Sequence, residues 1–111
     1  MSRSTSLRLL DIIESCDRIE SYIAGQDITS FEGDLKTQDA VIRQFEVIGE
    51  AVKCLPETLT ASHSQIPWKQ IAGFRDVLAH AYFAVDASVV WDAAENKAPL
   101  LKKTCEQLLN G

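Results

Sequence analysis

The segment Arg75–Tyr82 gathers side chains that suit phosphodiester chemistry: an arginine, an aspartate, a histidine and a tyrosine. Arginine is a permanent cation whose planar guanidinium binds phosphate oxygens. Histidine exchanges protons near neutral pH because its unperturbed pKa lies there, and this chain has two histidines in all. Breaking a phosphodiester bond requires one group that moves a proton and another that stabilises developing negative charge. His80 and Arg75 are therefore candidates for these two roles.

The spacing within this segment places the side chains on more than one face of a helix. Asp76 and His80 are four residues apart, so Asp76 would contact the imidazole, orient it and favour its protonated form. Arg75 and Tyr82 are seven residues apart and nearly aligned. Arg75 and His80 are five residues apart, about 140° around an ideal helix. Either the helix loosens near His80, or both side chains reach into a cleft completed by another element, such as another protomer.

The same residues have a purely structural interpretation. An arginine, an aspartate and a histidine on one helix often form a solvated face with a salt bridge, and a tyrosine such as Tyr82 is often a half-buried packing residue. Spacing alone leaves the chemical and the structural interpretations open.

Length and composition indicate one globular domain over residues 1–111. Apolar residues make up 46% of the chain and charged residues 24%, a balance that argues against disorder. No apolar run approaches the roughly 20 residues that span a bilayer, so no membrane association is expected. The first six residues are polar and lack the apolar stretch of a secretory signal, which leads us to expect a cytoplasmic protein.

The net charge of −5 limits how the chain would bind RNA. Affinity for a polyanion comes from neutralised phosphates, so an acidic chain would contact RNA locally, at a cleft lined by a few basic residues. The acidity is also compatible with a basic protein partner.

The cysteines and histidines do not indicate a metal site or a cofactor. Cys16, Cys54 and Cys105 lie far apart in apolar helical patterns, which predicts buried free thiols. His63 and His80 have no cysteine or histidine at ligand spacing.

The hydrophobic period is helical nearly throughout and predicts an all-α, up-down bundle of four to five helices. The first stripe ends at Ile23, with Ser4, Thr5 or Ser6 as its cap and Gly25 as its stop. The other helices are expected over about 36–55, from 66 to about 80, from Asp86, and from about 100 to 109.

The connecting segments carry further expectations. Residues 26–34 are predicted to be a connector with one short turn, from which Phe31 enters the core. Residues 56–65 are polar and turn-rich, and Pro99 is expected to break or restart the last helical pattern. The inward positions of the helix after Asp86 are predicted to be Val89, Val90, Ala93 and Ala94, and Leu100 is placed on the apolar face of the last segment.

Several blocks together resemble one known family. The pattern Arg75-x4-His80-x-Tyr82 resembles the signature of the HEPN superfamily, and the chain looks most like HepT-type toxins. Further blocks resemble that family in the same order, namely Asp39–Lys53, Ile66–Arg75, Tyr82–Asp86 and Val90–Trp91. The resemblance covers residues from about Leu7 to Leu101.

The chain departs from the family pattern at two places. Asp76 stands where the family often has asparagine, and an anion beside the arginine would weaken phosphate binding. Gln44-Phe45 replaces a frequent Asn-Leu. Neither change touches Arg75, His80 or Tyr82.

The resemblance implies a homodimer in which the helices of two copies face one cleft, so that two Arg75 and two His80 converge. It implies metal-independent endoribonuclease activity, in which the RNA 2′-hydroxyl attacks the adjacent phosphate. His80 would transfer protons, Arg75 would stabilise charge and Asp76 would orient one of these side chains. Arg43 and Glu46 of the second helix would line the cleft or form a solvated pair, and the solvated pair is the expectation for Glu46.

The resemblance also implies a partner. HepT-type toxins pair with a minimal nucleotidyltransferase antitoxin, which transfers AMP from ATP onto the motif tyrosine, here Tyr82. The substrate would be tRNA or mRNA. The alternative is a non-catalytic helical module that engages a nucleotidyltransferase, a nucleotide or RNA without cutting. The intact Arg75, His80 and Tyr82 favour the enzyme, whereas the acidic charge and Asp76 keep the alternative open.

Overall fold

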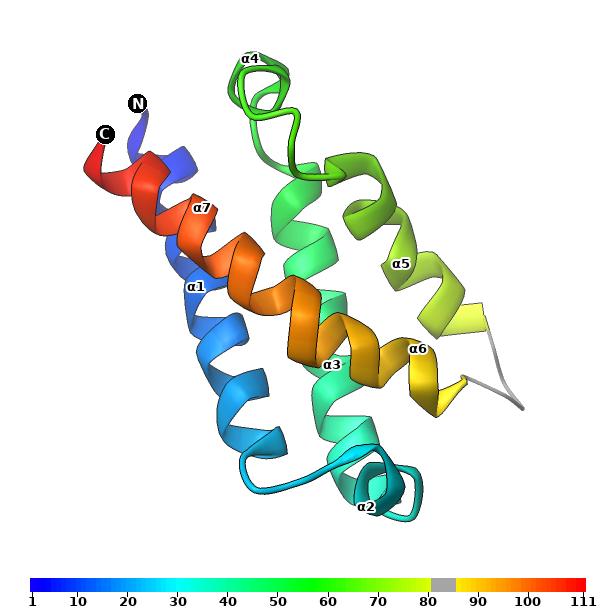
Figure 1. The fold of residues 1–111 in the computed structure, drawn as a ribbon. Helices are drawn as coiled ribbons and strands as arrows, with labels where there is room; N and C mark the ends of the chain where they lie inside the picture. Colours follow the sequence, from blue (N-terminus) through cyan, green and yellow to red (C-terminus); the bar gives the residue numbers. More distant parts are fainter. Residues whose placement is uncertain (81–85) are drawn as a thin grey trace.

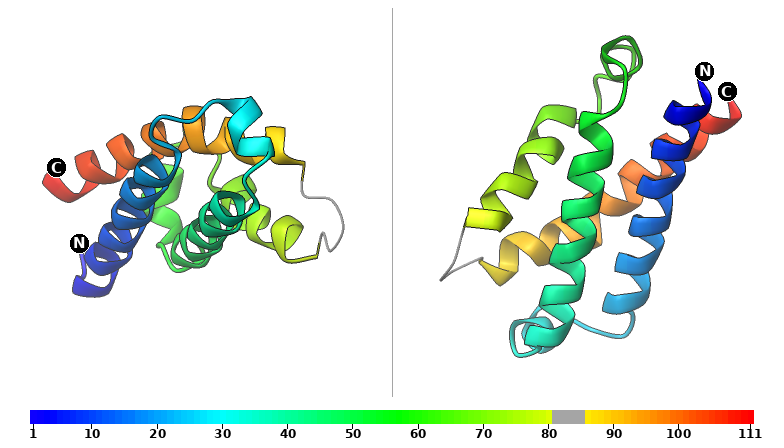
Figure 2. Two further views of the ribbon diagram at one scale, coloured as in Figure 1. Left: turned by 90° about the horizontal axis from the view of Figure 1, so that it is seen from below. Right: turned by 180° about the vertical axis from the view of Figure 1, so that it is seen from behind.

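The computed structural model describes residues 1–80 and 86–111, with the backbone alone at positions 75, 77, 79 and 80. The described residues form helices joined by turns, which confirms the predicted all-α bundle. Three up-down helices make one layer: α1 (Arg3–Ile23), α3 (Leu35–Lys53) and α5 (Trp68–His80), with α3 in the middle (Figure 2). None of the described helices is both long and apolar enough to cross a membrane.

A long helical rod crosses one side of this layer. It consists of α6 (Ala87–Asp92), the π-helical segment η1 (Ala93–Lys97) and α7 (Ala98–Asn110), which follow one another without a break (Figure 1). α7 packs mainly on α1, and η1 packs on α1 as well. The other side of the three-helix layer is not covered by a further described helix (Figure 2).

The ends of α1 follow local chemistry. The Ser2 side chain caps the helix by accepting a hydrogen bond from the Thr5 backbone N–H at 3.2 Å, so the predicted cap at residues 4–6 is wrong. Thr5 instead lies inside the helix and is buried. Gly25 follows the C-cap with a φ of 77°, a left-handed conformation that glycine adopts without strain, which confirms it as the stop signal.

The first connector contains the short helix α2 (Ile28–Glu32). The Asp27 carboxylate accepts a hydrogen bond from the Ser30 N–H at 2.8 Å, and the Ser30 hydroxyl accepts one from the Asp27 N–H, which forms a capping box. Phe31 is fully buried, and its ring lies 5.3 Å from that of Trp91. The expected insertion of Phe31 into the core is confirmed.

The second connector is more ordered than predicted. Residues 57–61 form the short helix α4 (Glu57–Ala61) after Pro56. A helix of this length has no room for an apolar period, which is why the sequence pattern indicated only turns.

Pro99 explains the π-helical segment in the long rod. Proline has no backbone N–H and clashes with the carbonyl four residues earlier in an α-helix. The backbone widens just before it, so that the Ala98 N–H bonds to the Ala93 carbonyl five residues earlier. α7 then begins with Pro99 in its first turn, as expected of a restart. Asp86 caps α6 through the Ser88 N–H at 2.9 Å, and the hydrogen bonds from Ser88 lower the pKa of the Asp86 carboxyl.

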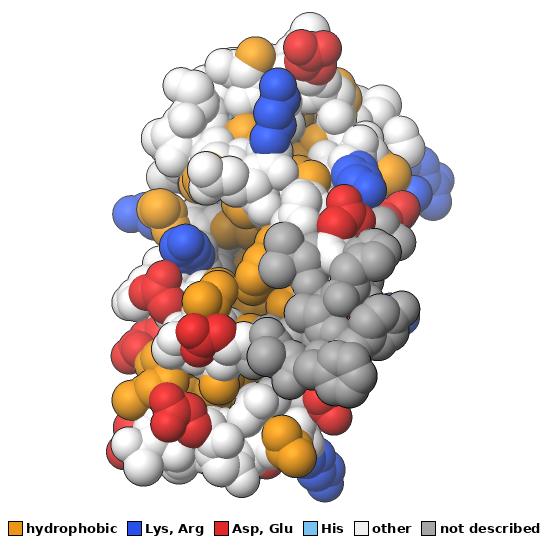
Figure 3. All heavy atoms as spheres, turned by 90° about the vertical axis from the view of Figure 1, so that its right-hand side faces the viewer, with side chains coloured by type: hydrophobic (Ala, Val, Ile, Leu, Met, Phe, Trp, Pro, Cys, Tyr) orange, Lys and Arg blue, Asp and Glu red, His pale blue; other side chains and the backbone are white. Residues whose placement is uncertain are grey.

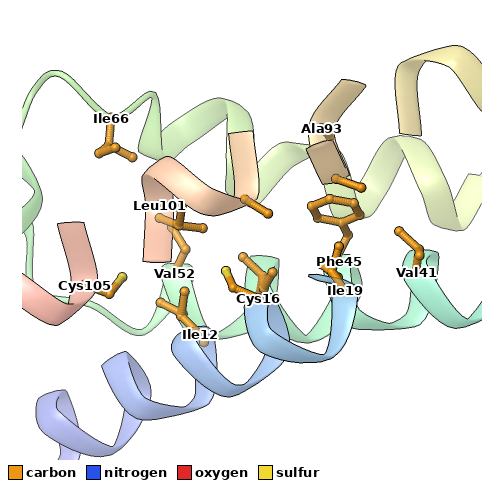
Figure 4. Packing of buried hydrophobic residues seen from close by; sticks show 14 of the residues in the cluster. Ile12, Cys16, Ile19, Val41, Phe45, Val52, Ile66, Ala93, Leu101 and Cys105 are labelled. Atoms are coloured by element: carbon orange, nitrogen blue, oxygen red, sulfur yellow. The ribbon is translucent and has the colours of Figure 1, made fainter. Parts of the chain in front are cut away.

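The core lies between α1, α3 and the rod. Figure 4 shows side chains of α1 directed toward α3 and α7, among them Ile12, Cys16 and Ile19. Val90, Ala93 and Ala94 are buried as predicted. Val89 and Leu100 are each 51% exposed, so their predicted inward positions are wrong. Leu100 is exposed on the rod, and Val89 lines an open groove between the rod and α5. Helical spacing alone did not separate these two positions from the buried stripe of the rod.

Replacement of the aromatic anchor of α2 tests the core. Phe31→Ala removes a fully buried ring and its contact with Trp91, so we expect the free energy of unfolding to fall by about 3–5 kcal/mol in urea denaturation. Thr29→Ala, an exposed change in the same short helix, is the matched control. It is expected to change the free energy of unfolding by less than about 0.5 kcal/mol. A loss below about 1 kcal/mol for Phe31→Ala would show that α2 does not anchor the bundle.

Candidate functional site

The site is built on α5, and the start of this helix is fixed by a tryptophan. Trp68 is buried, and its indole N–H donates a hydrogen bond to the His63 carbonyl at 2.9 Å. The Ile71 N–H bonds to the Pro67 carbonyl at 3.0 Å, which closes the first turn after the proline. These contacts tie α5 to the preceding loop and set its register.

The apolar stripe of α5 packs on α3. Leu78 is buried, and Phe74 is half-buried with its ring centroid 5.4 Å from that of Phe45 at an interplanar angle of 70°. Such an edge-to-face contact is a favoured arrangement of two aromatic rings. Among the described residues, the main contacts of α5 are with α3. The aromatic pair therefore positions the helix that carries the candidate catalytic residues.

The backbone of α5 is helical through His80. Arg75 and His80 thus occupy positions five residues apart on one continuous helix, about 140° around its axis. The spacing left two alternatives open, a helix that loosens near His80 and a cleft completed by another element. A backbone that stays helical through His80 favours the second. The side chains of Arg75 and His80, and the whole of Tyr82, lie outside the described residues, so their predicted roles remain predictions.

Asp76 is exposed on α5. It lies one helical turn before His80, the separation at which two side chains of one helix meet. Its backbone position therefore agrees with the predicted orienting role, which stays a prediction.

Arg43 and Glu46 lie together on α3 but apart from Asp76. The Arg43 guanidinium is 3.6 Å from the Glu46 carboxylate, and the two side chains are 70% and 32% exposed. They line a groove of about 280 Å³ between α1 and α3, opposite Arg8 and Asp11, which are 3.8 Å apart. The described lining of this groove includes no residue of α5. The pair is solvated, and its proposed place in a catalytic cleft stays a prediction.

A second groove, which the sequence interpretation missed, runs along α5. It lies between α5 and the rod, has α3 as its floor, and measures about 230 Å³. Figure 3 shows it as an apolar hollow. Its walls come in part from apolar residues of α3 and α5, among them Phe45, Ile48, Ile71 and Phe74. Periodicity identifies the apolar face of each helix, but it does not show whether two such faces meet.

The cysteines correct one prediction. Cys16 and Cys105 are buried free thiols, and burial raises the pKa of each to about 12. Cys54 is exposed at the C-terminal end of α3, so the prediction that all three are buried is wrong. The described residues include no group of three or more histidine, cysteine, aspartate or glutamate side chains arranged to hold a metal ion.

Comparison with known proteins identifies relatives over most of the chain. The family model described as "Ribonuclease HepT-like" matches residues 12–108. A protein of Thermococcus cleftensis named "Probable ribonuclease HepT" is 43% identical over 97% of this chain and 98% of its own length. A protein of Methanocaldococcus jannaschii that is named a "Putative RNase" is 43% identical over 91% of this chain and 84% of its own length. A "Putative RNase" of Caldanaerobacter subterraneus is 37% identical over 88% of each chain. No solved structure gives a significant match.

Thiol reactivity tests the placement of the cysteines. At pH 8, a thiol with a pKa of about 12 is ionised in about one molecule in ten thousand, and the thiolate is the reactive form. We expect Cys54 to react rapidly with a disulfide reagent such as DTNB in the native protein. Cys16 and Cys105 should react rapidly only after denaturation. A rapid native reaction that persists in Cys54→Ser would contradict this arrangement.

Proposed function

The chain belongs to the HepT-like ribonuclease family, and on that premise we propose that it is the toxin of a toxin–antitoxin pair and a metal-independent endoribonuclease. One observation carries the proposal. The family match spans residues 12–108 and so includes the whole segment Arg75–Tyr82, whose arginine and histidine lie on the continuous helix α5. The relatives named as ribonucleases cover nearly the full chain, which supports RNA as the substrate.

The proposed reaction uses the RNA's own nucleophile. The 2′-oxygen attacks the adjacent phosphorus, the bond from phosphorus to the 5′-oxygen breaks, and the products are a 2′,3′-cyclic phosphate and a 5′-hydroxyl. One proton leaves the 2′-hydroxyl and one reaches the departing 5′-oxygen. His80 transfers protons in this scheme, because imidazole is effective as both acid and base near neutral pH. Arg75 stabilises the added negative charge on the phosphoryl oxygens.

Asp76 is proposed as a positioning residue. Its carboxylate lies one turn before His80 on α5, where it would hold the imidazole in one orientation and favour its protonated form. The same negative charge lies next to Arg75 in sequence and opposes phosphate binding. Asp76→Asn would keep a hydrogen-bonding side chain while removing that charge.

A second copy of the chain is proposed to complete the cleft. Positions 75 and 80 point about 140° apart on α5, so the arginine and histidine of one helix would face different neighbours. A two-fold axis beside α5 would bring the arginine of one copy toward the histidine of the other. The side of the three-helix layer that the rod leaves uncovered is available for such a contact (Figure 2).

The proposed antitoxin is a minimal nucleotidyltransferase that modifies Tyr82. The phenolic oxygen would attack the α-phosphorus of ATP, so that AMP is attached and pyrophosphate leaves. The added nucleotide places bulk and negative charge beside Arg75 and His80, where it would repel an RNA phosphate. The modification would therefore inhibit cleavage without unfolding the toxin.

The second candidate function is a module that binds a nucleotidyltransferase, a nucleotide or RNA without cutting. The net charge of −5 and the exposed carboxylate of Asp76 keep this candidate open, chiefly as a module that binds a nucleotidyltransferase, because both weaken binding of a polyanionic substrate. The two candidates differ in whether His80 is required for bond breaking.

Cleavage of a tRNA and mRNA pool in EDTA separates the two. We expect the wild type to cut and to leave cyclic phosphate ends, and His80→Ala to lower the rate by about 10²–10⁴-fold through loss of proton transfer. His63→Ala, the other histidine, is the matched control and should cut normally. If a folded His80→Ala protein cuts as fast as the wild type, the proposed catalytic role is wrong. If neither protein cuts, and intact mass shows no modification, the binding module replaces the enzyme.

Intact mass tests the modification. Incubation with the partner nucleotidyltransferase and ATP should raise the mass of the chain by whole AMP units, and Tyr82→Phe should prevent the rise. Tyr22, the other tyrosine, is partly exposed on α1, and Tyr22→Phe should accept AMP as the wild type does. A rise that persists in Tyr82→Phe would exclude Tyr82 as the acceptor.

A further inference from the structure

The apolar groove beside α5 has the size of a ligand site. It measures about 230 Å³, and apolar cavities of about 150 Å³ already hold a benzene ring. Two aromatic rings, Phe45 and Phe74, form part of its lining together with aliphatic side chains of α3, α5 and the rod. The groove is therefore large enough for one flat ring with a substituent.

Two small residues, Ala93 and Ala98, leave space in the rod wall of the groove, beside Val89, Lys97 and Leu101. Ala93 and Ala98 line that wall at the two ends of the π-helical segment. Both are buried and present only a methyl group toward α5. π-helical turns occur frequently at functional sites. A larger side chain at position 93 would fill the space.

Two polar side chains give the groove a chemical preference. Gln70 of α5 and Lys97 of the rod line it together with the apolar residues. The Lys97 ammonium is 3.9 Å from the Asp92 carboxylate, the outer limit of an ion pair, and its side chain is 70% exposed. An amide offers both a donor and an acceptor, and an exposed ammonium attracts an anion. A flat ring fits the apolar lining, a hydrogen-bonding edge on that ring fits the Gln70 amide, and a nearby phosphate fits the Lys97 ammonium.

The groove follows the helix that carries the proposed catalytic residues. Ile71 and Phe74 line it, and position 75 follows directly, one helical turn beyond Ile71. A group held in the groove would therefore contact α5 within about one helical turn of position 75. In Figure 3 basic side chains lie above the apolar hollow and to its left.

We propose that this groove binds one unpaired nucleobase of the RNA substrate, next to the phosphate that is cleaved. This inference rests on the proposed function. The base packs against Phe74 and the aliphatic walls, Gln70 bonds to its edge, and Lys97 attracts an adjoining phosphate. Single-stranded RNA is commonly recognised by unstacked bases on aromatic side chains. The groove would select which unpaired position is cut.

Binding of AMP to the full chain tests the groove without relying on catalysis. We expect AMP to shift the isoleucine methyl NMR signals of Ile48 and Ile71 in a saturable way, while Ile12 and Ile19 in the core stay unchanged. Ribose 5-phosphate, which lacks the base, should shift neither groove methyl. Ala93→Leu should abolish the shifts by filling the groove, whereas the exposed Ala24→Leu should not.

A second variant leaves the groove open. Lys97→Gln is an exposed change that should raise the Kd for AMP about fivefold, the size of one exposed charge contact. Lys103→Gln, an exposed lysine of α7 outside the groove, should leave the Kd unchanged. Equal shifts with AMP and with ribose 5-phosphate would overturn the proposal. Shifts of Ile48 and Ile71 that follow protein concentration but not AMP would also overturn it and assign the groove to contact between copies.

Cleavage then separates this inference from the proposed function. If AMP binds as described, Ala93→Leu should change the distribution of cut sites in the RNA pool more than it lowers total cleavage. An unchanged distribution in Ala93→Leu would overturn the base pocket and leave the nuclease intact. AMP binding by a wild type that never cuts would contradict the proposed function and support the groove as a nucleotide site.

Discussion

The edge-to-face contact between Phe45 and Phe74 is the interaction on which the site depends, because it joins the helix that carries Arg75 and His80 to the rest of the bundle. Phe74 lies directly before Arg75 in sequence, and Phe45 lies in the middle of α3. Within the described part of the chain, α5 packs mainly on α3, whereas α1 and the rod pack on each other. The ring contact thus sets the position of the candidate catalytic residues relative to the core. The same two rings also line the groove between α5 and the rod.

Helical geometry then limits what one chain can do alone. Residues five apart on a helix point about 140° apart, and α5 is helical through His80. An arginine and a histidine that act on the same phosphate must converge within a few ångströms, which a single regular helix does not achieve at this spacing. In the proposed dimer, a second copy would supply the missing geometry and would concentrate positive charge at one place in an otherwise acidic protein. That concentration matters because a net charge of −5 opposes RNA binding over the rest of the surface.

Most of the fold follows from patterns that the sequence shows directly. The stripes of α1, α3 and α5, the stop at Gly25, the cap at Asp86 and the burial of Phe31 each have a local physical cause. The errors arise where burial depends on what lies opposite. Val89 and Leu100 fit an apolar helical face, but Leu100 is exposed on the rod and Val89 lines the open groove beside α5. Cys54 is the C-cap of α3 and is exposed between the buried residues Val52 and Leu55, because the regular spacing of the helix no longer fixes which way a side chain points at its end. The groove beside α5 could not be predicted, since it depends on Ala93, Ala98 and the backbone widening before Pro99.

The central claim is that two copies of the chain share one catalytic cleft, and mixing two inactive variants tests it most directly. Arg75→Ala and His80→Ala are each purified, shown to be inactive, and then combined under conditions in which subunits exchange, with mixed dimers counted by native mass spectrometry. If the site is shared, a mixed dimer contains one cleft with an intact arginine from one copy and an intact histidine from the other. We expect RNA cleavage to return in proportion to the mixed dimer. Mixed dimers that form but cut no faster than either variant alone would contradict a shared cleft.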